Sequence, residues 1–190
     1  MFTGWTGKEI IKTIVLFVLY VLLGYAAMYS GYYSPVYWML FPIAAAFLMA
    51  GPLTVMMSMK RGIGSALLLP LLFFILAKLI GELSFSCAWI PFLGIIIAAE
   101  LIRDILGAEK RFSIRSAVLI TLLSMAMWNN GFYFGGQAYM DAAVADMGTE
   151  YIGTAAGLST PLMYAAVVIG ILLAASISER LTEKIGGISA

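Results

Sequence analysis

Long apolar segments separated by small clusters of charged residues extend along the whole chain. The 47 positions between Lys12 and Lys60 contain no charged residue. A helix needs roughly 20 mostly apolar residues to cross the hydrocarbon core of a bilayer, so this stretch is too long for one span and fits two. Gly31 and Pro35, within a tyrosine-rich segment, favour a turn that divides it. The pattern therefore predicts transmembrane helices over residues 9–29 and 36–59.

The same reasoning divides the rest of the chain into four further spans, predicted over residues 62–82, 88–106, 114–133 and 160–178. The longest connection, residues 134–159, has a moderate helical pattern around residues 139–147 and is expected to be an outer loop. Within residues 36–59, Pro42 and the Gly51-Pro52 pair predict a kink or an interruption. We expect one membrane domain over residues 1–190, an all-α integral membrane protein built as a six-transmembrane-helix bundle.

The basic residues indicate how this bundle is oriented. Short loops rich in Lys and Arg stay on the cytoplasmic side of a membrane. Six spans place both termini and two loops on one side, and that side holds ten of the eleven basic residues: Lys8, Lys12, Lys60, Arg61, Arg103, Lys110, Arg111, Arg115, Arg180 and Lys184. The opposite side has Lys78 and a long loop whose charges are all acidic. We expect cytoplasmic N- and C-termini and a multi-pass location in the inner (cytoplasmic) membrane.

A secretory signal peptide is the alternative for the first thirty residues. The apolar run over residues 13–28 is longer than the usual 7–15 residues of such a signal, and a second apolar run follows almost at once. A first transmembrane helix is the better interpretation.

The composition supports a membrane protein and excludes several kinds of chemistry. Hydrophobic residues make up 63% of the chain, charged residues 11%, and the mean hydropathy is +1.00. The chain has no histidine and one cysteine, which excludes a Ser-His-Asp triad, disulfides within the chain and Cys-x-x-Cys metal sites. A net charge of +1 lacks the basic surface that nucleic-acid binding requires. We expect no enzyme activity, no cofactor, no metal and no nucleic-acid partner.

The outer end of the predicted span 114–133 carries the strongest candidates for a binding site. Trp128, Asn129, Asn130 and Tyr133 end this span, and Gln137 follows it. Two adjacent Asn side chains carry hydrogen-bonding groups that lipid cannot satisfy. Either they bond neighbouring helices or they line a cavity open to the outside. The aromatic neighbours favour a small-molecule pocket, with apolar walls and a few fixed polar groups.

Other residues expected at the same side join this candidate site. Lys78 and Glu82 are four positions apart and are able to pair, either as an interfacial ion pair or as part of a site for a charged or zwitterionic ligand. Trp89 opens the fourth predicted span. The aromatic residues of the first turn form a membrane-interface belt or a lid over the pocket, and both interpretations stay open: Tyr25, Tyr29, Tyr32, Tyr33, Tyr37 and Trp38. Of these, Tyr33 is the candidate substrate contact.

Charged residues near the cytoplasmic end of the span 88–106 point to structure rather than chemistry. Arg103 lies within reach of Glu100 and next to Asp104, so a structural ion cluster is favoured over a proton relay. A small intramembrane enzyme using Glu100, Asp104 or Asp141 is a less favoured alternative. An accessory subunit of another membrane complex is a second alternative.

The chain resembles the substrate-binding (S) components of energy-coupling factor (ECF) transporters, most closely the Trep_Strep group, also called the MptE family. The resemblance extends over almost the whole chain and rests on the order and spacing of four segments: Gly7-Lys8-Glu9-Ile10; Gly51-Pro52 with Lys60 and Gly62; Ala99-Glu100-Leu-Ile-Arg103; and Leu181-Thr-Glu-Lys-Ile-Gly186.

This resemblance implies a membrane subunit that captures a scarce micronutrient, such as a vitamin or cofactor precursor, at the outer face. An ECF coupling protein and two ATPase subunits would be its partners, and ATP would be hydrolysed by them. The absence of a Gly-x-x-x-x-Gly-Lys-Ser/Thr motif from this chain agrees with that division. In such families helices 4 to 6 and the outer loops form the pocket, and an Ala-x-x-x-Ala pair often lies on helix 1. Here the small residues of the first span come late, at Gly24, Ala26 and Ala27.

Overall fold

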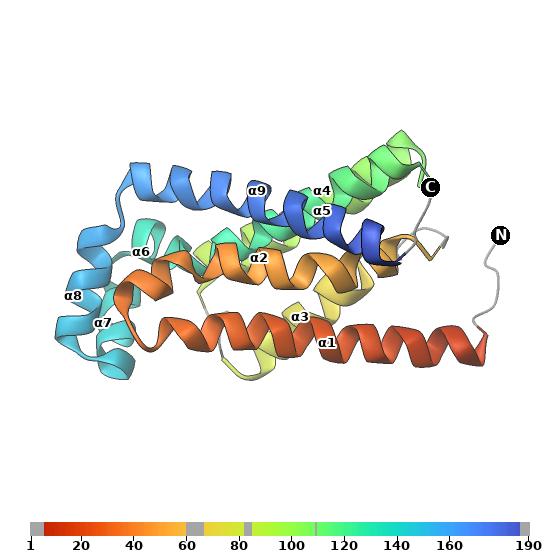
Figure 1. Ribbon diagram of the computed structural model, residues 1–190. Coiled ribbons are helices and arrows are strands. Elements are labelled where there is room, and N and C mark those ends of the chain that lie inside the picture. Colours follow the sequence, from red (N-terminus) through yellow and green to blue (C-terminus); the bar gives the residue numbers. More distant parts are fainter. Residues whose placement is uncertain (1–5, 60–66, 82–84, 109, 187–190) are drawn as a thin grey trace.

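The structure, a computed structural model, describes residues 6–59, 67–81, 85–108 and 110–186 (Figure 1). In these ranges every regular element is helical, which confirms the prediction of an all-α protein. The elements are α1 (Gly7–Gly31), α2 (Pro35–Met57), α3 (Leu68–Leu79), α4 (Ser86–Leu106), α5 (Arg111–Leu123), the 3₁₀ helix η1 (Ser124–Asn129), α6 (Asn130–Phe134), α7 (Gly136–Met147), α8 (Thr149–Leu158) and α9 (Pro161–Gly186).

Local sequence signals set the ends of the first two helices. Thr6 and Glu9 form a capping box, in which the Thr6 backbone N–H donates to Glu9 Oε2 at 2.8 Å. α1 ends at Gly31, and α2 begins at Pro35, whose missing N–H costs nothing in a first helical turn. A Cβ on Gly31 would lie 2.8 Å from a ring atom of Trp38, so glycine allows the close packing of this turn.

Several helices are long and apolar enough to cross a membrane. Within the described ranges, four candidate membrane spans are found: Gly7–Gly31, Pro35–Met57, Arg111–Phe134 and Pro161–Ile185. α4 has 21 residues, and α3 is a shorter apolar helix of 12 residues. The ends of the predicted span 62–82 lie outside the described residues. Four candidate spans support an integral membrane protein, and the count of six remains a prediction.

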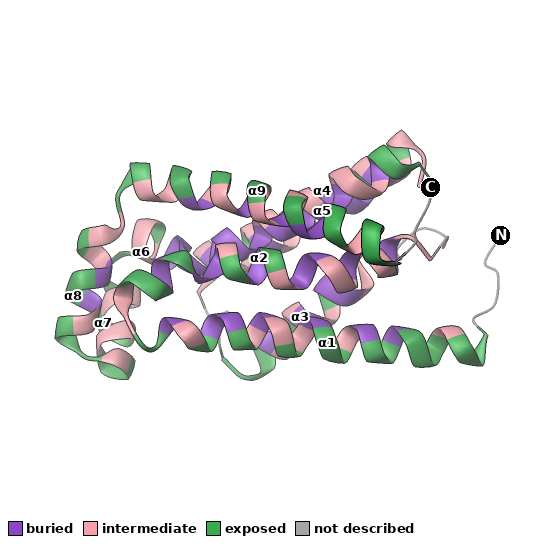
Figure 2. Cartoon of the chain, in the orientation of Figure 1, coloured by how far each residue is buried: buried purple, intermediate pink, exposed green. Residues whose placement is uncertain are grey.

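The outer faces of α1 and α9 expose apolar side chains. Figure 2 shows buried residues in the middle of the bundle and exposed residues along these two faces. Ile11 and Leu22 on α1 are 65% and 60% exposed, and Leu173 on α9 is 61% exposed. A soluble protein does not leave such long apolar faces in water, so their natural surroundings are lipid chains.

α2 forms the centre of the bundle, packed between α1 and α9 (Figure 1). Its buried side chains include Met39, Met49 and Leu53, none of them exposed. α1 approaches closely at Gly24, where a Cβ would lie 3.0 Å from atoms of Met49 and Phe73. Small residues at such contacts are typical of helix packing in membranes.

α2 continues through both of its internal prolines, Pro42 and Pro52, so the interruption considered from the sequence does not occur. Proline removes a helical hydrogen bond and displaces nearby carbonyls, which neighbouring groups must then satisfy. The Met39 carbonyl, three residues before Pro42, accepts a bond from the side chain of Asn129 at 3.1 Å. A polar side chain from another helix therefore supports α2 beside its first proline.

The two ends of the bundle differ. The start of α1 and the end of α9 lie at the same end, whereas α6, α7 and α8 lie at the opposite end (Figure 1). We call the end formed by α6, α7 and α8 the capped end. Residues 134–159, predicted as a loop with at most one short helix, contain both α7 and α8, so the loop prediction is wrong for most of this segment.

Candidate functional site

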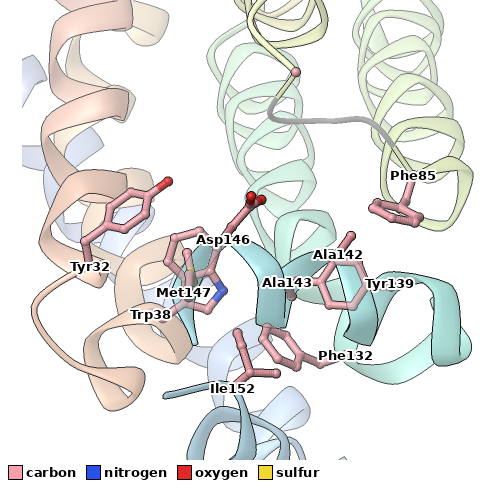
Figure 3. Close-up of a pocket in the computed structure, with 11 residues that line it drawn as sticks. Tyr32, Trp38, Phe85, Phe132, Tyr139, Ala142, Ala143, Asp146, Met147 and Ile152 are labelled. Atoms are coloured by element: carbon pink, nitrogen blue, oxygen red, sulfur yellow. The ribbon is translucent and has the colours of Figure 1, made fainter. Parts of the chain in front are cut away.

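A cavity of about 530 Å³ opens at the capped end (Figure 3). Its volume lies within the range of about 300–1,000 Å³ that is usual for small-molecule sites. The residues that line it come from the α1–α2 turn, α2, the α3–α4 connection, α6, α7 and α8: Tyr32, Trp38, Gly81, Phe85, Phe132, Tyr139, Ala142, Ala143, Asp146, Met147 and Ile152. Segments far apart in the sequence therefore build one site.

The lining changes from apolar in the interior to polar at the mouth. Trp38 and Ile152 are buried, Phe132 is half-buried, and Tyr32 and Asp146 are exposed. Figure 3 shows aromatic rings on two sides of the cavity, with the Asp146 carboxylate between them. This arrangement gives an aromatic floor and walls with one carboxylate at the rim.

Gly131 and Gly135 leave the space that the side chain of Tyr139 occupies. A Cβ on Gly131 would lie 2.1 Å from the Tyr139 ring, and one on Gly135 would lie 2.5 Å from the Tyr139 Cβ. The Tyr139 ring packs edge to face against Phe85 and Phe132, with centroids 5.2 Å apart in both cases. These contacts fix the aromatic wall, because edge-to-face pairs have a preferred geometry.

A tyrosine hydrogen bond attaches α8 to the end of α1. The Tyr151 hydroxyl donates to the Gly31 carbonyl. Burial raises the pKa of Tyr151 to about 12 and raises the pKa of Tyr139 above its ordinary value, so both hydroxyls stay protonated at neutral pH. Asp146 is then the one charged side chain among the described residues that line the cavity.

The predicted Asn129 and Asn130 bond neighbouring helices, which is one of the two roles that the sequence left open. Asn129 Nδ2 donates to the Met39 carbonyl of α2 at 3.1 Å. Asn130 Nδ2 donates to the Cys87 carbonyl of α4 at 2.9 Å, and its Oδ1 accepts from the Tyr164 hydroxyl of α9 at 3.2 Å. Neither side chain is in the lining of the cavity.

Trp128 is buried beneath the cavity. Its ring lies 6.3 Å from Phe41, 5.7 Å from Phe73 and 6.1 Å from Phe92, between centroids. Phe41 in turn packs against Trp38 of the cavity floor at 5.5 Å. The predicted tryptophan therefore does not reach the cavity, and it supports the floor through one intervening ring.

The segment around Trp128 contains buried polar atoms that have no hydrogen-bond partner within the part of the chain that the structure describes. They are Ser124 Oγ, Trp128 Nε1 and Asn129 Oδ1. All three belong to η1, which has six residues, whereas 3₁₀ runs longer than three or four residues are uncommon and often mark functional hinges. Sequence patterns give no signal for this element.

Three other predicted residues, Tyr133, Gln137 and Tyr33, also lie outside the cavity lining. The Tyr133 hydroxyl donates to the Thr160 carbonyl at 3.4 Å, and Gln137 Nε2 donates to Asp141 Oδ1 at 2.7 Å on the exposed face of α7. Tyr33 is 88% exposed at the α1–α2 turn.

Of the predicted Lys78–Glu82 pair, the structure describes Lys78. Lys78 Nζ lies 5.4 Å from the ring centroid of the predicted Trp89, as in a cation–π contact. Glu82 lies outside the described residues.

Sequence reasoning missed the residues of α7 that line the cavity. Tyr139, Ala142, Ala143 and Asp146 recur at spacings of three and four, which places them on one face of a helix. This signal was present in the helical pattern around residues 139–147. Tyr32 and Trp38, which the sequence grouped with a possible lid, do line the cavity.

A second group of charges lies where α4 ends, α5 begins and α9 ends, which we call the paired end. Arg103 has no exposed side-chain surface, and its Nη2 lies 3.0 Å from Glu100 Oε1 and 3.4 Å from Asp104 Oδ1. The Ser113 hydroxyl donates to the Arg103 carbonyl at 2.6 Å. These contacts confirm the predicted ion cluster.

Two further ion pairs join α5 to α9 at the paired end. Arg115 Nε lies 3.2 Å from Glu179 Oε2, and Arg111 Nε donates to Glu183 Oε1 at 2.9 Å. Each chain segment contributes residues four apart, one helical turn. Within the described ranges, no group of three or more Cys, Asp or Glu side chains is placed to hold a metal ion.

A family model described as "Hypothetical bacterial integral membrane protein (Trep_Strep)" matches residues 7–186. No curated protein and no solved structure matches the chain.

Proposed function

We propose a function that starts from one premise: the chain belongs to the Trep_Strep family of bacterial integral membrane proteins. Within that family it acts as the substrate-binding subunit of an ECF-type importer. It captures a small micronutrient at the outer face of the cytoplasmic membrane. A coupling protein and two ATPase subunits then drive delivery inward, and the subunit itself carries out no chemistry.

The cavity at the capped end is the observation that carries this proposal. It has the volume of a small-molecule site, and its lining combines aromatic walls with a few polar groups. Because its walls come from six parts of the chain, a bound molecule would contact most of the capped end at once. Binding of the ligand would then change the conformation of several helices at once, and transport requires such a change.

The distribution of basic residues supports an outward-facing cavity. The described basic residues of the paired end include Arg103, Arg111 and Arg115, whereas residues 116–179 contain no Lys or Arg. Positive charge is retained on the cytoplasmic side of bacterial membranes. In the proposal, six crossings place the paired end inside and the capped end outside.

Native mass spectrometry of the protein, purified gently from its own membranes, tests the proposal. We expect a discrete bound small molecule and co-purifying ATPase subunits. Ala143→Phe places a ring in the cavity and is expected to abolish the ligand mass without loss of folded protein. Ala145→Phe is the matched control, because Ala145 is exposed on α7 outside the lining.

Two results would contradict the proposal. One is retention of the ligand by the Ala143→Phe variant. The other is a bare wild-type protein, without ligand or ATPases, under conditions in which a known S component retains both. The second result would favour an accessory role in another membrane complex.

A further inference from the structure

We propose that the molecule bound in the cavity is a small organic cation with an aromatic or apolar body. Its positive group pairs with Asp146 at the rim, and its body packs against Trp38, Phe132 and Tyr139. This inference rests on the proposed function, because it names the chemical class of the substrate of that same site.

The charges of the cavity lining and of segment 116–178 favour a cation. Asp146 is the one charged side chain among the described lining residues. The whole segment 116–178 has three charged residues, Asp141, Asp146 and Glu150, and all are acidic. Walls of low dielectric focus the field of such charges into a cleft, which raises the local concentration of cations and repels anions.

The aromatic lining favours the same class of ligand. Five of the eleven lining residues carry aromatic rings: Tyr32, Trp38, Phe85, Phe132 and Tyr139. The faces of these rings are electronegative and attract ammonium groups, most strongly where water is excluded. A carboxylate beside several rings is therefore better suited to an organic cation than to a neutral or anionic molecule of the same shape.

The gradient of burial indicates how the ligand is oriented. Trp38 and Ile152 are buried at the floor and carry no charge that could pair with a cation, and Trp38 Nε1 is a donor, which a cation cannot use. Asp146 is exposed at the rim. A charged group at the floor would lose its hydration without a partner, so the body enters first and the charge stays at the mouth.

Isothermal titration calorimetry on the protein in lipid nanodiscs tests the inference with three probes of similar size. They are 2-phenylethylammonium, 2-phenylethanol and phenylacetate. We expect the cation to bind about tenfold more tightly than the alcohol, and phenylacetate to bind least. Asp146→Asn should weaken binding of the cation about tenfold and leave the alcohol unchanged.

Asp141→Asn is the matched control. Asp141 lies on the same helix and carries the same charge, but its carboxylate accepts from Gln137 and is not in the cavity lining. We expect this variant to bind all three probes as the wild type does. Equal effects of the two substitutions would overturn the role of Asp146.

The outcomes separate this inference from the proposed function. If Ala143→Phe removes the native ligand but the three probes bind alike, or none binds at millimolar concentration, the cation inference fails and the proposed function stands. If Ala143→Phe leaves the native ligand bound, the cavity is not the transport site. A cation preference lost in Asp146→Asn and kept in Asp141→Asn supports the inference.

Discussion

Charged side chains have different surroundings at the two ends of the bundle. At the paired end, Arg103 is completely buried and lies against Glu100 and Asp104. At the capped end, Asp146 is exposed at the rim of a cavity whose other described lining residues are uncharged. A buried charge is stable only with a partner, whereas a charge at a wet rim needs none from its own chain. The first arrangement holds helices together, and the second is suited to a ligand.

Because of this difference, we expect the paired end to stabilise the fold and the cavity rim to bind a ligand. Substitutions at the paired end should change the stability of the fold, and substitutions at the cavity rim should change affinity alone. The predictions below test this separation, from the largest expected effect to the smallest.

Arg103→Met should have the largest effect on stability. It leaves Glu100 buried without its 3.0 Å partner, and removing one member of a buried pair costs about 3–5 kcal/mol. Thermal unfolding of the detergent-solubilised protein, followed by size-exclusion chromatography, measures the loss. The double variant Arg103→Met, Glu100→Gln should recover much of it, because the buried side chain at position 100 is then neutral and Asp104, which also loses Arg103, is partly exposed to solvent. An unchanged melting temperature in the single variant would contradict a structural role for the pair.

Asn130→Leu should have the next largest effect. It removes the bonds to the Cys87 carbonyl and the Tyr164 hydroxyl and leaves those groups without this partner, which costs about 1–3 kcal/mol. The matched control is Gln137→Leu, which removes a side-chain amide from the exposed face of α7 and should change stability by less than about 0.5 kcal/mol. Equal melting temperatures for the two variants would show that Asn130 does not join the helices.

Tyr151→Phe should weaken the attachment of α8 to α1 by about 0.5–1.5 kcal/mol, the usual net contribution of one hydrogen bond. The pKa of Tyr151 is about 12 in the folded protein and about 10 in an unfolded chain. The contribution of its proton is therefore present below pH 10 and is lost as the pH rises to 12. Between these values the wild type should lose more stability than the variant in thermal unfolding. Parallel curves would argue against this linkage.

Asp146→Asn should have the smallest effect on stability, within about 0.5 kcal/mol of the wild type, because an exposed rim carboxylate makes little contribution to folding. Thermal unfolding without ligand measures this. A large loss of stability would erase the distinction between the two ends, since it would give Asp146 a structural role like that of Arg103.

The sequence predicted the framework of the bundle because its signals are local. The turn between α1 and α2 follows from Gly31 and Pro35, and the ion pair of Arg103 with Glu100 follows from their spacing of three on one helix. α8 was missed because its ten residues combine glycines and threonines with few large apolar residues, so its pattern is weak. η1 was missed because a 3₁₀ run has no distinct hydrophobic period of its own in a buried segment.

The candidate site predicted from the sequence and the cavity lie at the same end of the bundle, but the cavity is lined by other residues than those predicted there. Trp128, Asn129 and Asn130 were chosen because polar groups in a membrane need partners. Their partners turned out to include backbone carbonyls of α2 and α4, 90 and 43 positions away. A single sequence does not reveal such distant acceptors, so a buried amide that joins helices looks the same as one that binds a ligand.

The sequence by itself determined the membrane character of this protein, its helical class, the turn after the first span and the concentration of basic residues at one end. These depend on the hydropathy and charge of neighbouring residues, which act over one or two helical turns. The tertiary structure alone decided which polar groups are satisfied within the protein and which face a cavity. That choice depends on side chains and carbonyls brought together from α1, α2, α6, α7 and α8, because only packing determines whether a polar group meets a partner or open space.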